Sequence, residues 1–124
     1  MFEVSVEQSF SAAHRLMGYK GKCENMHGHN WKVRAEIKNK NLDKQGMVVD
    51  FTDLKKALVT ILMRLDHKVL NDITYFKKIN PTSENIAKYI YKEISLILTK
   101  PSIVSVWETD TSCASYYEPS PSLR

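Results

Sequence analysis

The chain has 124 residues, of which 43% are hydrophobic and 26% are charged, and its formal net charge is +4. This size and composition predict one globular domain that buries a core without disulfides or other staples. No apolar run of about eighteen residues occurs, which argues against a membrane-spanning helix. The acidic, alternating N-terminus, MFEVSVEQSF, does not have the pattern of a signal peptide.

The number of cysteines and the distribution of charge indicate the compartment in which the protein works and the kinds of ligand it binds. Two cysteines, Cys23 and Cys113, are too few for a disulfide framework, so we expect a reduced, cytoplasmic protein. The lysines are dispersed, without the block of five or six like charges that marks a nucleic-acid tail. A small phosphorylated molecule therefore explains the positive charge as well as a nucleic acid does.

The first two predicted elements are strands. In residues 2–14 apolar and polar side chains alternate, which predicts a half-buried strand. A second alternation over residues 30–38 predicts another strand with one solvent-facing side. Strands with one wet side favour an antiparallel sheet.

In the middle of the chain, the spacing of apolar residues is typical of two helices. The apolar stripe after Asp50 predicts a helix with Asp50 as its N-cap, and a second helix is predicted after Pro81 with Thr82 as its N-cap. Residues 102–110 and 112–119 then predict two more short strands. The order ββααββ indicates an α+β domain with a four-stranded antiparallel sheet over residues 1–118, followed by a frayed tail at 119–124.

Three of the four histidines fall in phase with the apolar faces of the first two strands. His14 ends the first strand, and His27 and His29 begin the second, with Cα atoms about 6.6 to 6.8 Å apart. If the strands pair antiparallel, the three imidazoles converge, and three imidazoles with an open fourth position are typical of catalytic zinc. The alternative is that these histidines only cap strand ends or form surface hydrogen bonds.

Cys23 lies in the long connection 15–26, close to the predicted metal site and next to Lys22. A nearby cation or zinc ion lowers the pKa of a thiol and favours the thiolate. Cys23 is then a fourth zinc ligand, a base or nucleophile, or an inert thiol. Cys113 is interpreted as a small core residue.

Asp66, His67 and Glu108 are further candidates. Asp66 and His67 follow the first helix, where they form either a proton relay or a helix-terminal capping pair. Glu108 shares the face of Val104 and Val106, so its carboxylate points toward the core and needs a partner, such as two adjacent N–H groups of a pterin or guanine. The alternative is that the strand has ended and Glu108 is solvated.

Six motifs occur in order between Met1 and about Glu118: FSAAHRL, CENMHGHNW, VVDF, LDH, NPTSENIA and WETDTSCASYY. Together they resemble the 6-pyruvoyltetrahydropterin synthase superfamily. Three residues separate Cys23 from His27, whereas the animal pyruvoyl enzymes have a longer gap. The resemblance therefore favours the bacterial branch that forms 6-carboxytetrahydropterin in queuosine and 7-deazapurine biosynthesis.

The resemblance implies a role for each candidate. His14, His27 and His29 are similar to the family's zinc ligands, and Cys23 resembles its catalytic base, with Glu24 as an alternative. The remaining implied roles are a catalytic relay for Asp66 and His67, a catalytic and pterin-anchoring carboxylate for Glu108, and substrate binding for Thr82 and Lys22, with Lys20, Lys22 and Arg15 as candidates for the triphosphate.

The resemblance also implies a fold and a reaction. The fold is the tunnelling fold (T-fold), a sheet with two helices on one side that assembles into trimeric barrels and hexamers. The reaction is the zinc-dependent conversion of 7,8-dihydroneopterin triphosphate to 6-carboxytetrahydropterin, acetaldehyde and triphosphate, without a nucleic acid or a membrane. The alternatives are a 6-pyruvoyltetrahydropterin synthase acting on the same substrate and a zinc-stabilised nucleic-acid-binding module.

Overall fold

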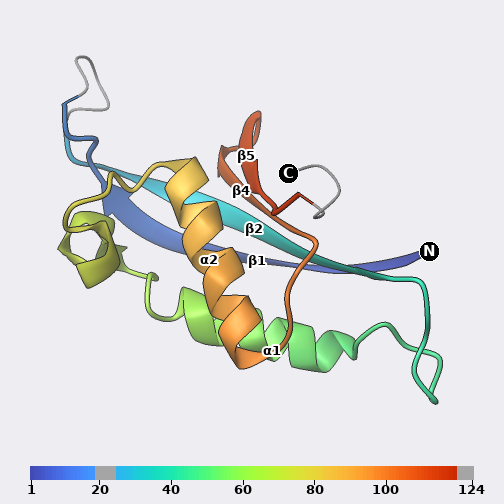
Figure 1. Cartoon of the computed structure of the whole chain (residues 1–124). Coiled ribbons are helices and arrows are strands. Elements are labelled where there is room, and N and C mark those ends of the chain that lie inside the picture. The colour runs from blue at the N-terminus through green and yellow to red at the C-terminus, as the bar shows by residue number, and fades with distance from the viewer. Residues whose placement is uncertain (19–24, 120–124) are drawn as a thin grey trace.

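The computed structural model describes residues 1–18 and 25–119. Two long strands, β1 (Phe2–His14) and β2 (His27–Asn39), precede both helices. The remaining elements, in chain order, are α1 (Phe51–Leu62), β3 (Lys68–Val69), two 3₁₀ turns (Leu70–Asp72 and Thr74–Phe76), α2 (Ser83–Ile97), β4 (Ile103–Thr109) and β5 (Ser112–Tyr116). The predicted order of four strands and two helices is confirmed (Figure 1).

The strands form one sheet in the order β3-β1-β2-β4-β5. β1 and β2 pair antiparallel along their whole length, from Phe2 opposite Asn39 to His14 opposite His27. β4 and β5 extend the antiparallel part, as predicted. The two-residue β3 is an addition to the prediction: it pairs parallel with β1 and makes the sheet five-stranded and mixed.

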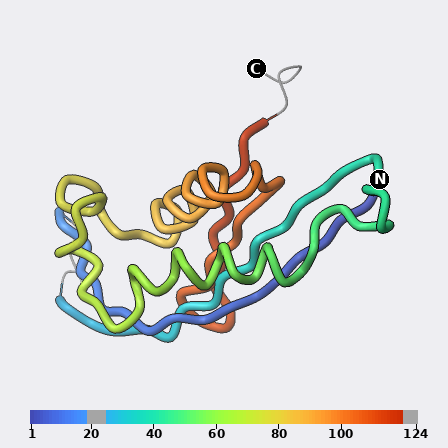
Figure 2. Tube along the Cα trace, turned by 90° about the horizontal axis from the view of Figure 1, so that it is seen from below, coloured from blue at the N-terminus to red at the C-terminus, as the bar shows by residue number. Residues whose placement is uncertain are grey.

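Both helices cover the same face of the sheet, as Figures 1 and 2 show from two directions. Each begins at the predicted N-cap: the Asp50 side chain accepts the N–H of Thr52 at 2.7 Å, and the Thr82 hydroxyl accepts the N–H of Asn85 at 3.1 Å. The helix stripes and the alternating strand residues bury one core between the layers. Its fully buried side chains include Trp31, Val33, Leu54, Leu58, Ile61, Ile86, Ile90, Ile94, Val104 and Val106.

The opposite face of the sheet, which we call the open face, carries charged and polar side chains. Arg34 pairs with Glu7 at 2.7 Å, and the Lys32 ammonium lies 4.3 Å from the centre of the Trp107 ring. Cys113 pairs with Trp107 across β4 and β5 and is exposed, so its interpretation as a core residue is wrong. The alternation of β5 puts it on the open face. No helix among the described residues is long and apolar enough to cross a membrane.

Candidate active site

The ends of three strands bring three histidines and a glutamate together on the helix-covered face. β1 ends with His14, which lies opposite His27, while His29 lies opposite Ala12. Glu108 is still inside β4 and continues the face of Val106, so the alternative of a solvated residue beyond the strand is wrong. One ligand atom from each of the four side chains lies within 4.8 Å of all the others. The convergence of the three histidines is confirmed.

The hydrogen bonds of His14 and His27 direct their Nε2 atoms into this cluster. The Nδ1 of His14 lies 2.7 Å from the Pro81 carbonyl oxygen, and the Nδ1 of His27 lies 2.7 Å from the Asn25 carbonyl oxygen. A carbonyl only accepts, so each Nδ1 carries a proton, and an imidazole that donates from Nδ1 has its lone pair on Nε2 unless that nitrogen is protonated as well. These two Nε2 atoms are 3.1 Å apart. Two facing lone pairs repel each other unless a cation lies between them.

His29 completes a donor set that fits a metal ion. Its Nε2 is buried and has no hydrogen-bond partner among the described residues, although Glu108 Oε1 lies 3.3 Å away without hydrogen-bond geometry. The same Oε1 lies 3.1 Å from His14 Nε2. Three imidazoles and a carboxylate are ligands that zinc prefers, and carbonyl oxygens on Nδ1 are its usual outer partners. The residues present therefore fit a divalent metal such as zinc.

Packing beneath the cluster holds the rings in place. Trp31 is fully buried, and its ring centre lies 4.9 Å from that of His14 and 5.2 Å from that of His29. The Trp31 indole N–H donates to the Ala12 carbonyl at 3.2 Å, which fixes the ring. Contact with this buried ring restricts the orientations that the His14 and His29 imidazoles can take.

The segment that supports His14 is itself braced. The Asn85 side chain donates to the Asn80 carbonyl at 2.9 Å, and Thr82 caps α2 one residue beyond Pro81. These bonds hold the Pro81 carbonyl against the His14 ring. The sequence did not reveal this carbonyl or that of Asn25, because any residue type supplies one.

Burial lowers the pKa of both His14 and His29 from the ordinary value of 6.5, although Glu108 opposes the shift. Below pH 6.5 the unfolded chain then binds more protons at these positions than the folded chain does. We expect the free energy of unfolding of the metal-free protein to fall as the pH drops from 6.5 to 5. Urea unfolding of the wild type and of His29→Asn at several pH values measures this. In the variant, the free energy of unfolding should depend less steeply on pH, because one of the two histidines is absent. Equal slopes in the two proteins would contradict it.

Asp66 and His67 form the predicted pair. The carboxylate of Asp66 accepts His67 Nδ1–H at 2.9 Å and the Ser11 N–H at 2.8 Å. The hydrogen bond from the Ser11 N–H is the main cause of a lowered pKa of Asp66, and the bond from His67 lowers this pKa further. The His67 N–H in turn donates to the Ser11 carbonyl at 2.6 Å. His67 has a φ of 58°, which is rare for a residue other than glycine and is found disproportionately at functional sites.

The structure does not bring His67 into the histidine cluster. Its side chain is 82% exposed, and with Ser11, Gly28 and Asn30 it borders a depression of about 470 Å³ at the open face. His29 borders the same depression, but its Nε2 belongs to the cluster on the helix-covered face. Within one chain, His67 therefore does not belong to the cluster, although it borders the same depression as His29.

The other predicted site residues are placed as follows. Thr82 lies at the start of α2, where its hydroxyl is used in capping, so substrate binding by Thr82 stays a prediction. Cys23, Lys20, Lys22 and Glu24 lie outside the described residues, as does most of the predicted tail. The proximity of Glu108 to the histidines was not predicted, although its phase with Val106 indicated the correct face.

The fold and the cluster define an α+β domain with three histidines and a glutamate, a donor set that fits a metal ion, gathered at the ends of its strands. The chain matches the 6-pyruvoyl tetrahydropterin synthase family over residues 3–119 and belongs to that family. It is 39% identical to the 6-pyruvoyl tetrahydrobiopterin synthase of Drosophila melanogaster, over 92% of this chain and 78% of that protein. It is 34% identical to the 6-carboxy-5,6,7,8-tetrahydropterin synthase of Haemophilus influenzae, over 95% and 100%.

Solved structures agree with this assignment. The 6-pyruvoyl tetrahydropterin synthase of Caenorhabditis elegans superposes with a TM-score of 0.83 and 31% identity, over 96% of this chain and 98% of that chain. The domain thus has the T-fold, and the chain is a member of an enzyme family of pterin synthases.

Proposed function

We propose that the protein is a zinc-dependent 6-carboxy-5,6,7,8-tetrahydropterin synthase acting in queuosine and 7-deazapurine biosynthesis. It converts 7,8-dihydroneopterin triphosphate and one water molecule to 6-carboxytetrahydropterin, acetaldehyde and triphosphate. The observation that carries the proposal is the convergence of three histidine Nε2 atoms in a member of this family. Relatives carry both the carboxy and the pyruvoyl names, so the choice of product rests on the three residues between Cys23 and His27.

The residues divide the chemistry between them. When bound by His14, His27 and His29, zinc supplies a Lewis acid for the hydroxyl groups of the substrate side chain. Cys23 removes a proton as the thiolate, and His67, oriented by Asp66, accepts or returns a proton at a second position. The 2.9 Å bond from His67 Nδ1 to Asp66 supports this role, because it leaves His67 Nε2 as the exchanging atom.

Glu108 is proposed to anchor the pterin ring. Its side chain is 29% exposed, and Oε1 makes both contacts with the histidines, which leaves Oε2 for a ligand. A carboxylate accepts two adjacent N–H groups of a pterin in bidentate geometry. The same position is compatible with a fourth metal ligand, so the two roles must be separated by measurement.

The variant Glu108→Gln distinguishes a pterin anchor from a fourth metal ligand. For a pterin anchor we expect the KM for substrate to rise by about ten- to a hundredfold, since a charge-assisted bidentate contact is lost, while zinc affinity changes by less than about threefold. Steady-state kinetics and competition with a chromophoric chelator measure the two quantities. Glu7→Gln, on the open face, is the control for loss of one negative charge. A large loss of zinc affinity with unchanged KM would show that Glu108 is a metal ligand instead.

The protein is proposed to act as a homo-oligomer, a trimer or a hexamer. The Asp66–His67 pair lies just before β3, at an edge of the sheet, and His67 is not among the groups that converge in the histidine cluster of its own chain. A relay must approach the substrate, so a neighbouring subunit's pair is proposed to complete each site. Family membership and the T-fold support this assembly.

Product analysis tests the proposed function. Zinc-loaded protein is incubated with 7,8-dihydroneopterin triphosphate, and the products are separated and weighed by mass spectrometry. We expect 6-carboxytetrahydropterin, acetaldehyde and triphosphate. A 6-pyruvoyl product would instead support the second candidate, which the 39% identity to the Drosophila enzyme favours. No consumption of substrate would refute both.

A further inference from the structure

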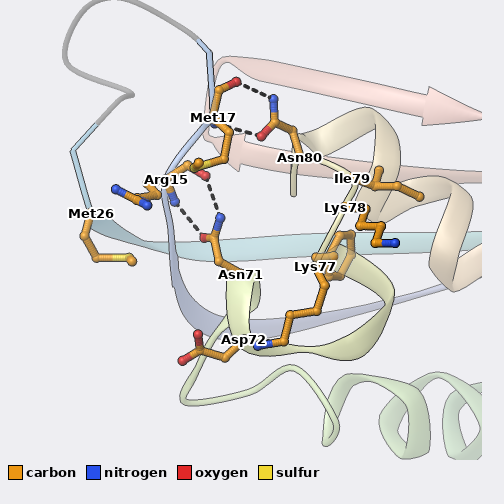
Figure 3. A pocket seen from close by; sticks show the side chains of 10 residues that line it. Arg15, Met17, Met26, Asn71, Asp72, Lys77, Lys78, Ile79 and Asn80 are labelled. Atoms are coloured by element: carbon orange, nitrogen blue, oxygen red, sulfur yellow. Dashed lines mark hydrogen bonds between the residues drawn. The ribbon is translucent and has the colours of Figure 1, made fainter.

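A cavity of about 700 Å³ is lined by residues of the segments that follow β1, precede β2 and precede α2 (Figure 3). Three of its lining residues are direct neighbours of the groups that build the cluster: Arg15 follows His14, Met26 precedes His27, and Asn80 precedes Pro81. Its volume is in the range of roughly 300 to 1,000 Å³ that is usual for small-molecule sites. A ligand whose reacting end is at the histidines can therefore extend into this cavity.

The cavity lining has an excess of positive charge. Arg15, Lys77 and Lys78 line it together with a single carboxylate, that of Asp72. None of these three cations forms an ion pair within residues 1–18 and 25–119, whereas Arg34, Lys92 and other basic residues are paired. Three unpaired cations around one cavity favour an anionic ligand.

Two asparagine side chains fix the wall of the cavity that carries Arg15. Asn71 accepts the Arg15 N–H and donates to the Arg15 carbonyl, both at 2.9 Å. Asn80 does the same for Met17, at 2.7 and 2.9 Å. Figure 3 shows both amides turned toward residues 15–17. These four bonds tie residues 15–17, beyond the end of β1, to Asn71 and Asn80, and Lys77 and Lys78 lie between these two asparagines in the chain.

We propose that this cavity binds the polyphosphate end of the substrate, with Arg15, Lys77 and Lys78 as its ligands. The inference rests on the proposed function and deepens it. Of the triphosphate candidates taken from the sequence, it keeps Arg15 and adds two lysines distant in the chain. Cations that line the cavity also stabilise the negative charge that develops on a departing polyphosphate, so the cavity serves the reaction as well as binding.

Inorganic triphosphate is the probe for this site, because it lacks the pterin. Its binding to the full-length protein is measured by calorimetry for the wild type and for the double variant Lys77→Gln/Lys78→Gln. We expect the Kd to rise by about tenfold or more, since two charge-assisted contacts are lost. The matched control is Lys55→Gln/Lys56→Gln, an exposed lysine pair on α1, for which less than about a twofold change is expected. Equal effects of the two double variants, or no binding by the wild type, would overturn the proposal.

Two further experiments distinguish failure of the polyphosphate site from failure of the proposed pterin synthase function. Metal-free and zinc-loaded protein are compared, because triphosphate held only by zinc would bind the loaded form alone and equally well in both lysine variants, which would overturn the site. If the pterin substrate is turned over with the same KM in the Lys77/Lys78 variant, the cavity assignment is wrong and the function stands. If triphosphate binding depends on these lysines while no pterin is converted, the site stands and the function is wrong.

Discussion

His27→Ala is expected to weaken zinc binding by at least about a hundredfold and to abolish turnover. The reason is that a side chain bound directly to a metal contributes more than the groups that hydrogen-bond to it, whose loss costs about 10- to 100-fold. His27 contributes Nε2 to the cluster and is only partly buried, so its removal leaves the core intact. His67→Ala is the matched control. It removes the one histidine outside the cluster, so zinc affinity should be unchanged while turnover is lost. Chelator competition and a turnover assay measure both.

The same two variants test the shared site. Each is inactive alone, but a mixed oligomer contains sites in which an intact histidine cluster meets an intact relay from a neighbour. We expect activity to return when the two proteins are dissociated and reassembled together. Loss of zinc in His67→Ala would contradict the assignment of the cluster, and failure of the mixture to regain activity would place cluster and relay in one chain.

Cys23→Ala is expected to lower turnover by about 10²- to 10⁴-fold, the usual contribution of a general base, with zinc affinity unchanged. The reason is that the proposed thiolate removes a proton from the substrate, whereas the histidines alone coordinate the zinc ion. Cys113→Ala is the control, since Cys113 is exposed on β5 and has no proposed part in the reaction. Steady-state kinetics of both variants, with zinc content measured in parallel, provide the comparison.

Cobalt substitution decides between base and ligand for Cys23. A protein in which only histidines and oxygen atoms hold the metal lacks a thiolate-to-metal charge-transfer band. We expect no such band in the cobalt-loaded wild type. A band that disappears in Cys23→Ala would show that the thiol is a fourth ligand and that the site is closed.

Strand periodicity made the core of the site predictable. A side chain changes face with every residue, so the apolar phase of residues 2–14 and 30–38 also fixed the face of His14, His27 and His29. An antiparallel pair then brings the end of one strand to the start of the next, as the register of His14 opposite His27 confirms. The helix starts at Asp50 and Thr82 were predictable because an N-cap depends on local side-chain chemistry.

Other features depend on contacts that one sequence does not display. β3 has two residues, too few to show a period, and it exists because residues 68 and 69 pair with β1. The cavity is lined by Arg15 and by Lys77 and Lys78, which are separated by about sixty residues of sequence. Asn71 and Asn80, on either side of the two lysines in the chain, bond to residues 15 and 17. Asparagines in a loop are read as turn formers, so their bidentate pairing with residues 15 and 17 left no signal in the pattern.

The alternative of a zinc-stabilised nucleic-acid-binding module is not favoured by the surface. The open face of the sheet mixes acidic and basic side chains, as in the pairs Glu7–Arg34 and Glu3–Lys38. Neutralised pairs of this kind attract a phosphate backbone weakly. Arg15, Lys77 and Lys78, which form no ion pair with any residue that the structure describes, line a cavity instead of forming a stripe.

The central claim is that His14, His27 and His29 hold the metal ion on which the pterin reaction depends. Titration of the metal-free protein with zinc, with consumption of 7,8-dihydroneopterin triphosphate measured at each step, tests it most directly. Each chain supplies one histidine cluster, so turnover is predicted to rise linearly and to stop rising at one zinc ion per chain. Full turnover by the metal-free protein in the presence of a chelator, or no turnover at one zinc ion per chain, would contradict the account.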